Sequence, residues 1–201
     1  MSEKINILRI VKEDILRILA EGRRRNISLD VIREEVKVSY PFISKAIEEL
    51  EKEKLVQYQQ SFLKLTREGE KNAKDILRKH LILESYFKKT RNEEEAHKAA
   101  HILEHYISEG VLNKVKKLST FKGKGISVSK LGLRELRMIT DIQTSDHELF
   151  ERIVSMGIFP GEEIRKIREI SDGVIVGVNG KSFALGKEIA EKIRVLENEK
   201  T

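Results

Sequence analysis

Cysteine is absent from this 201-residue chain, and proline occurs only twice. Without cysteine the chain can form no disulfide bond, no thiolate metal site and no cysteine nucleophile. Aromatic residues make up 5% of it, and no apolar run approaches the roughly 20 residues of a membrane-spanning helix. The N-terminal segment carries acidic residues where a signal peptide would be basic and then apolar. We therefore expect a soluble protein of the cytoplasm.

Hydrophobic residues (39%) and charged residues (36%) are both abundant, so the chain can bury a core. At roughly 150 residues per domain, its length allows one or two ordinary domains, or three small ones. The net charge of +6 comes from residues 1–125, whereas residues 126–201 are slightly acidic. This distribution fits a polyanionic partner for the first part of the chain, but a Lys- and Glu-rich surface of the thermophilic type fits it equally well.

The N-terminal third has the pattern of a winged helix-turn-helix. Apolar residues at helical spacing, with Gly22 as a stop and Ser28 and Ser39 as N-caps, predict three helices. The spacing of apolar residues then changes from that of a helix to that of two short strands, which are joined by a turn at residues 59–61. The predicted elements are helices over 4–21, 29–36 and 39–50 and strands over 55–58 and 62–65. Three helices followed by a small hairpin define this motif.

Further helices and then a β-rich segment follow. Thr66 and Asn92 are predicted N-caps, and Gly110 separates the second of these helices from a shorter one. Two glycines in residues 119–129 are typical of a linker, and the later pairs Asp172-Gly173 and Asn179-Gly180 predict β-hairpins. The expected helices are 66–89, 92–109, 111–118 and 186–191, and the expected strands are 164–170, 174–178, 182–185 and 193–196. The predicted fold class is multidomain and mainly α, with a small C-terminal β-barrel.

Four of the five histidines fall between positions 80 and 105. Three of them have the spacing i, i+4, i+8, and an acidic residue lies on the same helix face. One more i, i+4 pair of a histidine and a glutamate lies on the preceding helix. The six candidate metal ligands are His80, Glu84, His97, His101, Glu104 and His105. Imidazoles and carboxylates that point the same way can bind a divalent transition metal.

Two other interpretations of this cluster remain open. The histidines can be polar members of an amphipathic stripe in a core or a dimer, although burying several titratable groups without a metal is costly. A metal with an open coordination position can also activate water for hydrolysis. The sequence, however, contains no H-E-x-x-H, G-x-S-x-G or P-loop motif, which argues against an enzyme.

The segment KHLILESYF…EEEAHKAAHILEHYIS resembles the metal-binding and dimerisation region of the diphtheria toxin repressor family of metal-dependent transcriptional regulators. KVSYPFISKAIEELEKEKLV resembles the recognition helix and wing of that family, and EDILRIL its first helix. The C-terminal region is similar to the SH3-like FeoA domain found in many members. The resemblance covers about residues 5–196 and implies a winged helix-turn-helix over 1–67, a helical metal-binding and dimerisation domain over 68–120, a linker over 121–128 and a FeoA/SH3-like domain over 129–197.

The resemblance also implies two metal positions. The primary position would use Asp14, His101, Glu104 and His105, and the ancillary position would use His80, Glu84 and His97, with Asp146 as a further ligand or as part of a surface turn at 144–149. At the primary position, Asp14 and His101 replace the Met and Cys of iron-type members. Relative to manganese-type members, Arg17 replaces the second acid. An N/O ligand set without sulfur suits Fe²⁺ or Mn²⁺ and would also accept Co²⁺, Ni²⁺ or Zn²⁺.

By the same resemblance, the partners are double-stranded DNA with a palindromic operator and a second copy of the chain, with no membrane and no small organic substrate. The candidate DNA-binding residues are Ser39, Tyr40, Pro41, Phe42, Ser44 and Lys45, and Arg23, Arg24 and Arg25 reach the DNA backbone or form a solvated loop. The leading hypothesis is a metal-dependent repressor of metal homeostasis genes. A winged-helix regulator with a purely structural metal site is the first alternative, and a metal-dependent hydrolase or iron-transport accessory protein is the second.

Overall fold

The computed structural model describes residues 7–22, 26–120 and 125–197. Arg23, Arg24 and Arg25 lie outside the described residues. The chain divides into two compact units, residues 1–81 and 82–201, with the boundary inside one long helix. No helix in the described ranges is both long and apolar enough to cross a membrane.

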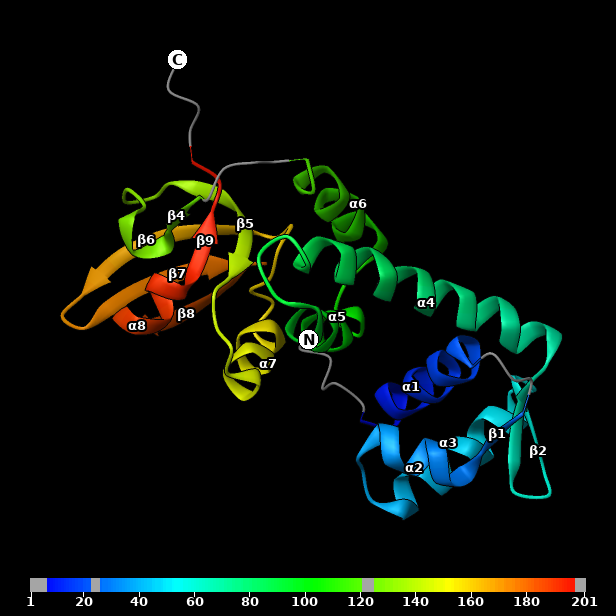
Figure 1. The fold of residues 1–201 in the computed structure, drawn as a ribbon. Helices are drawn as coiled ribbons and strands as arrows, with labels where there is room; N and C mark the ends of the chain where they lie inside the picture. Colours follow the sequence, from blue (N-terminus) through cyan, green and yellow to red (C-terminus); the bar gives the residue numbers. More distant parts are fainter. Residues whose placement is uncertain (1–6, 23–25, 121–124, 198–201) are drawn as a thin grey trace. The chain divides into compact units, whose positions relative to one another are not determined.

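The first unit is a winged helix-turn-helix, as predicted. Its elements are α1 (Ile7–Glu21), β1 (Ile27–Ser28), α2 (Leu29–Val36), α3 (Tyr40–Lys52), β2 (Val56–Gln59), β3 (Phe62–Leu65) and the first part of α4 (Arg67–Phe87) (Figure 1). The buried face of α1, including Val11 and Ile15, packs with Ile43 and Leu50 of α3 in one apolar core. Because these residues recur at helical spacing, the sequence pattern alone located this core.

The wing is an antiparallel sheet in the order β1-β3-β2. Gln60 and Ser61 form the tight turn between β2 and β3, both with positive φ (49° and 66°), as two-residue hairpin turns require. The strand β1 was not predicted, because two residues are too few to show a period. It pairs with β3 through Ile27 opposite Leu63.

The start of α4 is fixed against the base of the wing. The predicted cap is present, since the Gly69 amide donates to Thr66 Oγ1 at 3.0 Å. A Cβ atom on Gly69 would lie 1.9 Å from the Leu55 carbonyl oxygen, so only glycine permits this approach.

The second unit combines helices with a six-stranded antiparallel sheet. It contains the end of α4, α5 (Glu93–Glu104), α6 (Glu109–Leu118), β4 (Ile126–Ser127), a 3₁₀ turn (Val128–Lys130), β5 (Leu136–Ile142), α7 (His147–Ser155), β6 (Glu163–Ile170), β7 (Gly173–Val178), β8 (Lys181–Gly186), α8 (Lys187–Lys192) and β9 (Ile193–Val195). The strand order is β4-β9-β5-β6-β7-β8. Both glycine-based hairpins and the final helix and strand form as predicted, which confirms the mainly α fold class with a C-terminal β domain.

Four features of the second unit differ from the sequence prediction. The strand β4 lies inside the predicted linker and pairs with β9 through Ile126 opposite Val195. Helix α5 ends at Glu104 rather than near 109, because the amides of Tyr106 and Ile107 turn back to the Leu103 carbonyl. The strand β5 and the helix α7 were not predicted individually within the β-rich segment.

A single hydrophobic core runs through this unit. It joins Phe87 of α4 and Leu103 of α5 to Ile139 of β5, Phe150 of α7 and Val176 of β7. Helix α7 lies beside α5 (Figure 1). The helical part and the sheet of this unit therefore share one hydrophobic interior.

Candidate metal centre

Three of the predicted ligands meet at the C-terminal end of α5. His101, Glu104 and His105 each offer a ligand atom, and these atoms lie within 4.8 Å of one another. The ring centroids of His101 and His105 are 5.7 Å apart. His101 and His105 are four residues apart, so the right-handed backbone that continues through His105 keeps both on one face.

Burial distinguishes this group, which we call the buried ligand group (His101, Glu104 and His105). Glu104 is 4% exposed and His105 is 7% exposed, and His101 is partly buried. Glu104 Oε1 lies 3.7 Å from His105 Nε2. Two imidazoles and a carboxylate in a shielded place form a borderline N/O donor set, which suits a divalent first-row metal.

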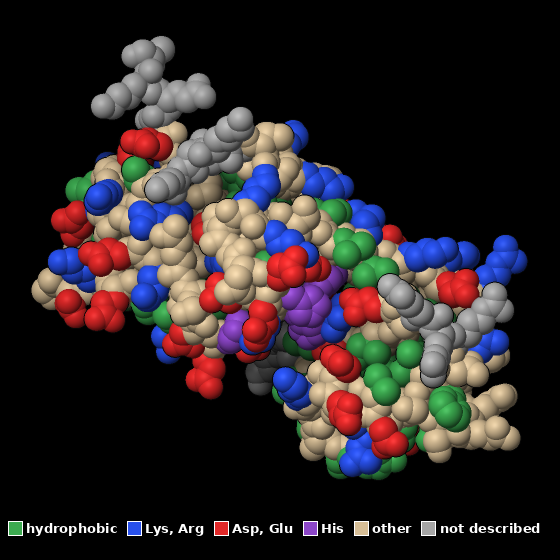
Figure 2. Space-filling view, viewed as in Figure 1, with side chains coloured by type: hydrophobic (Ala, Val, Ile, Leu, Met, Phe, Trp, Pro, Cys, Tyr) green, Lys and Arg blue, Asp and Glu red, His purple; other side chains and the backbone are tan. Residues whose placement is uncertain are grey.

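A second group of ligands is far more open. His97 Nδ1 lies 3.9 Å from Glu84 Oε2, with the His97 side chain 48% exposed and the Glu84 side chain 17% exposed. We call these two residues the exposed ligand pair. His97 is one turn before His101, and their ring centroids are 6.5 Å apart. Histidine side chains gather in one area of the visible surface, next to acidic side chains (Figure 2).

Lys88 contacts the exposed ligand pair and was not among the predicted site residues. Its Nζ lies 2.8 Å from Glu84 Oε1, one helical turn away on α4. The hydrogen bond to the Glu84 carboxylate raises the pKa of Lys88 above its usual value. The i, i+4 spacing of Glu84 and Lys88 is the sequence signal that could have revealed this contact.

The remaining two predicted ligands, Asp14 and His80, belong to the first unit. Asp14 lies on α1 and is 4% exposed, and His80 lies on α4, one turn before Glu84, and is 1% exposed. Arg17, one turn after Asp14 on α1, forms two hydrogen bonds of 2.9 Å from Nη1 to the Glu21 carboxylate.

Asp146 begins a helix rather than lying in the surface turn that the sequence suggested for residues 144–149. Its Oδ1 accepts a hydrogen bond of 3.1 Å from the Leu149 amide, which makes it the N-cap of α7. Asp146, His147 and Glu148 are all exposed. Among the residues that the structure describes, Asp146 is not one of those whose ligand atoms cluster.

The candidate DNA-binding residues lie at the N-terminal end of α3 and are accessible. Tyr40 is 50% exposed and Phe42 is 44% exposed. Ser39, Pro41 and Lys45 are also exposed, and Ser44 is partly buried. Ser39 occupies the N-cap position, but its side chain makes no capping hydrogen bond, in contrast to the sequence prediction. The guanidinium of Arg33 lies over the Tyr40 ring, 5.3 Å from its centre.

Comparison with known families agrees with this architecture. Residues 66–122 match the model of the iron dependent repressor, metal binding and dimerisation domain. Residues 127–197 match the model of the FeoA domain. The two matched segments follow one another with a gap of four residues. These two matches agree with the resemblance to the diphtheria toxin repressor family and with a FeoA domain at the C-terminal end of the chain.

Several solved structures are similar to this chain along most of its length. A manganese-dependent transcriptional repressor in complex with manganese is 20% identical, with a TM-score of 0.49, and the match covers 93% of this chain and 100% of that one. IdeR of T. acidophilum is 19% identical, with a TM-score of 0.43 and coverage of 98% and 99%. ScaR with bound Cd²⁺ is 23% identical, with a TM-score of 0.43 and coverage of 93% and 99%. No curated protein sequence matches the chain.

Proposed function

We propose that this protein is a DNA-binding transcriptional repressor that controls metal homeostasis genes and requires a divalent metal, Fe²⁺ or Mn²⁺, to bind its operator. The observation that supports it best is the buried ligand group, with ligand atoms within 4.8 Å of one another. This group lies inside the segment that matches a repressor's metal binding and dimerisation domain.

The donor chemistry of the described residues fits such a metal. In our proposal, Asp14 joins His101, Glu104 and His105 in the primary set, and His80 joins Glu84 and His97 in the ancillary set. A buried carboxylate and buried imidazoles lose hydration, and a bound cation would compensate that loss. The set has no sulfur, so it favours Fe²⁺ or Mn²⁺ where those metals are available, while Co²⁺, Ni²⁺ and Zn²⁺ would bind in vitro.

The DNA-binding surface in this proposal is the N-terminal end of α3. The hydroxyls of Ser39, Tyr40 and Ser44 are suited to phosphate oxygens or base edges, and Lys45 to a guanine edge or a phosphate. Pro41 and Phe42 can contact thymine methyl groups. The exposure of the Phe42 ring supports a role in contact rather than in packing.

The proposed switch follows from where the ligands lie in the chain. Asp14 is on α1 of the DNA-binding unit, whereas His101, Glu104 and His105 are on or just after α5. The bound cation would supply a bond to both and so restrain the DNA-binding unit. In a twofold dimer, two restrained recognition helices about 34 Å apart would read a palindrome. The metal favours the DNA-competent form only to the extent that it binds that form more tightly.

Fluorescence anisotropy with pooled palindromic DNA tests this function. The protein is titrated at fixed salt with a chelator and then with Mn²⁺, Fe²⁺, Zn²⁺ or Ni²⁺, because phosphate contacts alone change affinity by orders of magnitude with salt. We expect a large metal-dependent gain. Tight binding that ignores the chelator would make the metal structural only, and an absence of DNA binding under all conditions would contradict the proposal.

A matched pair of lysine variants tests the DNA-binding surface. Lys45 and Lys52 are both exposed on α3, but Lys52 is at the opposite end of the helix. Lys45→Ala should weaken binding in the metal-loaded state about 10-fold, as the loss of one good base or phosphate contact does. Lys52→Ala should leave it unchanged. Equal effects of the two substitutions would contradict the assignment of the contact surface.

A further inference from the structure

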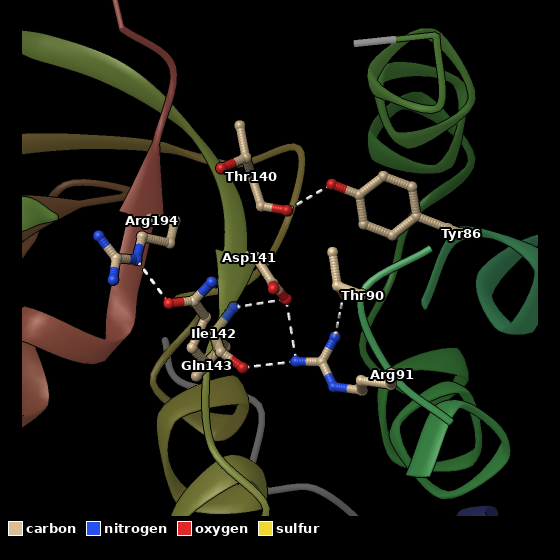
Figure 3. A network of polar contacts seen from close by, with 8 residues as sticks. All are labelled: Tyr86, Thr90, Arg91, Thr140, Asp141, Ile142, Gln143 and Arg194. Atoms are coloured by element: carbon tan, nitrogen blue, oxygen red, sulfur yellow. Dashed lines mark hydrogen bonds and ion pairs between the residues drawn. The ribbon is translucent and has the colours of Figure 1, made fainter. Parts of the chain in front are cut away.

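A buried arginine joins the turn between α4 and α5 to the sheet of the second unit. The turn is firmly hydrogen-bonded at both sides: the Arg91 amide donates to the Phe87 carbonyl at 3.0 Å, and Asn92 caps α5 through the Glu95 amide at 2.9 Å. The Arg91 side chain leaves this turn toward β5. Its Nη2 lies 2.9 Å from Asp141 Oδ1 and also donates to the Ile142 carbonyl (Figure 3).

The surroundings of Arg91 shield its contact with Asp141 from water. The Arg91 and Asp141 side chains are only 7% and 10% exposed. The guanidinium lies over the rings of Phe87 and Phe150, at 4.6 Å and 5.7 Å from their centres. An arginine that is both ion-paired and stacked on aromatic rings has a single well-defined geometry, which lysine does not reproduce.

A second hydrogen bond joins the same helix to the same strand. The Tyr86 hydroxyl donates to the Thr140 carbonyl, one residue before Asp141 (Figure 3). Burial, and then the nearby Asp141 carboxylate, raise the pKa of Tyr86, so its hydroxyl keeps the proton that it donates. On the strand side, Asp141 Oδ1 also accepts from the Ile142 amide at 2.9 Å, which fixes the carboxylate itself.

In the sequence, Tyr86 and Arg91 lie between the two residues of the exposed ligand pair. Tyr86 follows Glu84 by two residues on α4, and Arg91 precedes His97 by six residues. The 3.9 Å separation of Glu84 Oε2 and His97 Nδ1 depends on how the end of α4 and the start of α5 are held together. The helices α4 and α5 form a helical hairpin, and the contacts of Tyr86 and Arg91 with β5 connect this hairpin to the sheet near its turn.

We propose that Arg91 and Asp141 are positioning residues for the exposed ligand pair, so that the FeoA-like sheet controls the affinity of that pair for a divalent metal without donating a ligand. The inference rests on the proposed function only in taking a divalent metal as the ligand. Supporting contacts outside the ligands themselves typically change metal affinity by about 10- to 100-fold.

Metal titration of the full chain with Co²⁺ tests this role. His97→Ala first identifies which binding step belongs to the exposed ligand pair. Arg91→Met and Asp141→Asn should each weaken that step about 10-fold and leave the other step unchanged, and the double variant should be no weaker than either single one. Arg91→Lys should recover only part of the affinity. Arg152→Met, on an exposed arginine of α7, is the control and should change nothing.

A second measurement separates positioning from metal chemistry. In the metal-free protein, amide hydrogen exchange of residues 84–97 should become faster in Arg91→Met, and in Arg91→Lys if the methionine variant does not fold. Unchanged exchange and unchanged Co²⁺ affinity in folded variants would overturn the inference while leaving the proposed function intact. If the wild-type protein binds no Co²⁺, the proposed function fails, and the exchange result still decides whether Arg91 holds the hairpin.

Discussion

The two ligand groups, one at the C-terminal end of α5 and one shared by α4 and α5, differ in their exposure to water. The buried ligand group is enclosed, with Glu104 and His105 each below 10% exposure, whereas the His97 side chain of the exposed ligand pair is 48% exposed. Polar groups removed from water must gain compensating interactions, while exposed ones remain hydrated. We assign the proposed switch to the enclosed group.

The exposed ligand pair also contacts a positively charged side chain, that of Lys88. The ammonium group of Lys88 lies 2.8 Å from Glu84 Oε1 and balances the carboxylate charge. A metal that approaches Glu84 must compete with this contact. We therefore expect metal binding at the buried ligand group to act as the proposed switch and binding at the exposed ligand pair to have a smaller effect.

The largest effect is expected at the buried ligand group. His105→Ala removes a donor that is 7% exposed and leaves the Glu104 carboxylate without its neighbouring imidazole. The tighter metal-binding step should weaken by about 100-fold or more, the upper range for changes at such sites. A competition titration with a coloured chelator measures the affinity, and size-exclusion chromatography checks that the oligomeric state is unchanged. A variant that keeps the wild-type affinity would show that the group is not the tight site.

Metal should stabilise the folded protein through the same group. A ligand at 100 times its Kd adds about 2.7 kcal/mol to the free energy of unfolding. For a chain of this size we expect a rise in Tm of about 5–10 °C on addition of Mn²⁺ to chelator-treated protein. Differential scanning fluorimetry gives this shift, and in His105→Ala most of it should disappear. A full shift in that variant would place the stabilising metal elsewhere.

A smaller effect is expected at the exposed ligand pair. His97→Ala removes one half-exposed donor, and the weaker metal-binding step should lose about 10-fold in affinity. The tighter step should not change, because His97 is not part of the buried ligand group. Isothermal titration calorimetry resolves the two steps. If both steps weaken together, the two groups act as one site and the distinction between them fails.

The smallest effect concerns the competing lysine. Lys88→Met removes the ammonium group from Glu84, and the affinity of the exposed ligand pair for Mn²⁺ should rise by about twofold, since solvent-exposed ion pairs of this kind are weak. Lys89→Met, on the next exposed residue, is the matched control. A loss of affinity in Lys88→Met would mean that the lysine supports the site rather than competing for it.

The sequence predicted those elements whose signal lies within a short segment, such as the spacing of apolar residues along a helix or the residue types of a turn. The helical spacing of Ile43 and Leu50 located the core face of α3, and Asn179-Gly180 located a hairpin turn, because period and turn chemistry are properties of short segments. The i, i+4 spacing likewise predicted that His101 and His105 lie on one helix face, and their ring centroids are 5.7 Å apart.

The elements that were missed lack such local signals or have misleading ones. In β5 the adjacent polar residues Thr140 and Asp141 are buried, and the pairing with β9 shifts register between Ile139 and Asp141, so the strand shows no alternation of apolar and polar positions. In α7 the cap Asp146 was interpreted as a metal ligand or turn residue, although Phe150 and Ile153 follow it at helical spacing. The contact of Arg91 with Asp141 spans 50 residues, and nothing in the sequence of either segment indicates the other.

The central claim is that the buried ligand group controls DNA binding and the exposed ligand pair only adjusts it. The most direct test compares the wild-type protein, His105→Ala and His97→Ala in the same anisotropy experiment, with chelator and with Mn²⁺ at one salt concentration. We predict that wild type and His97→Ala gain affinity for palindromic DNA when Mn²⁺ is added and that His105→Ala gains none. A metal-dependent gain in His105→Ala equal to that of the wild type would contradict the claim.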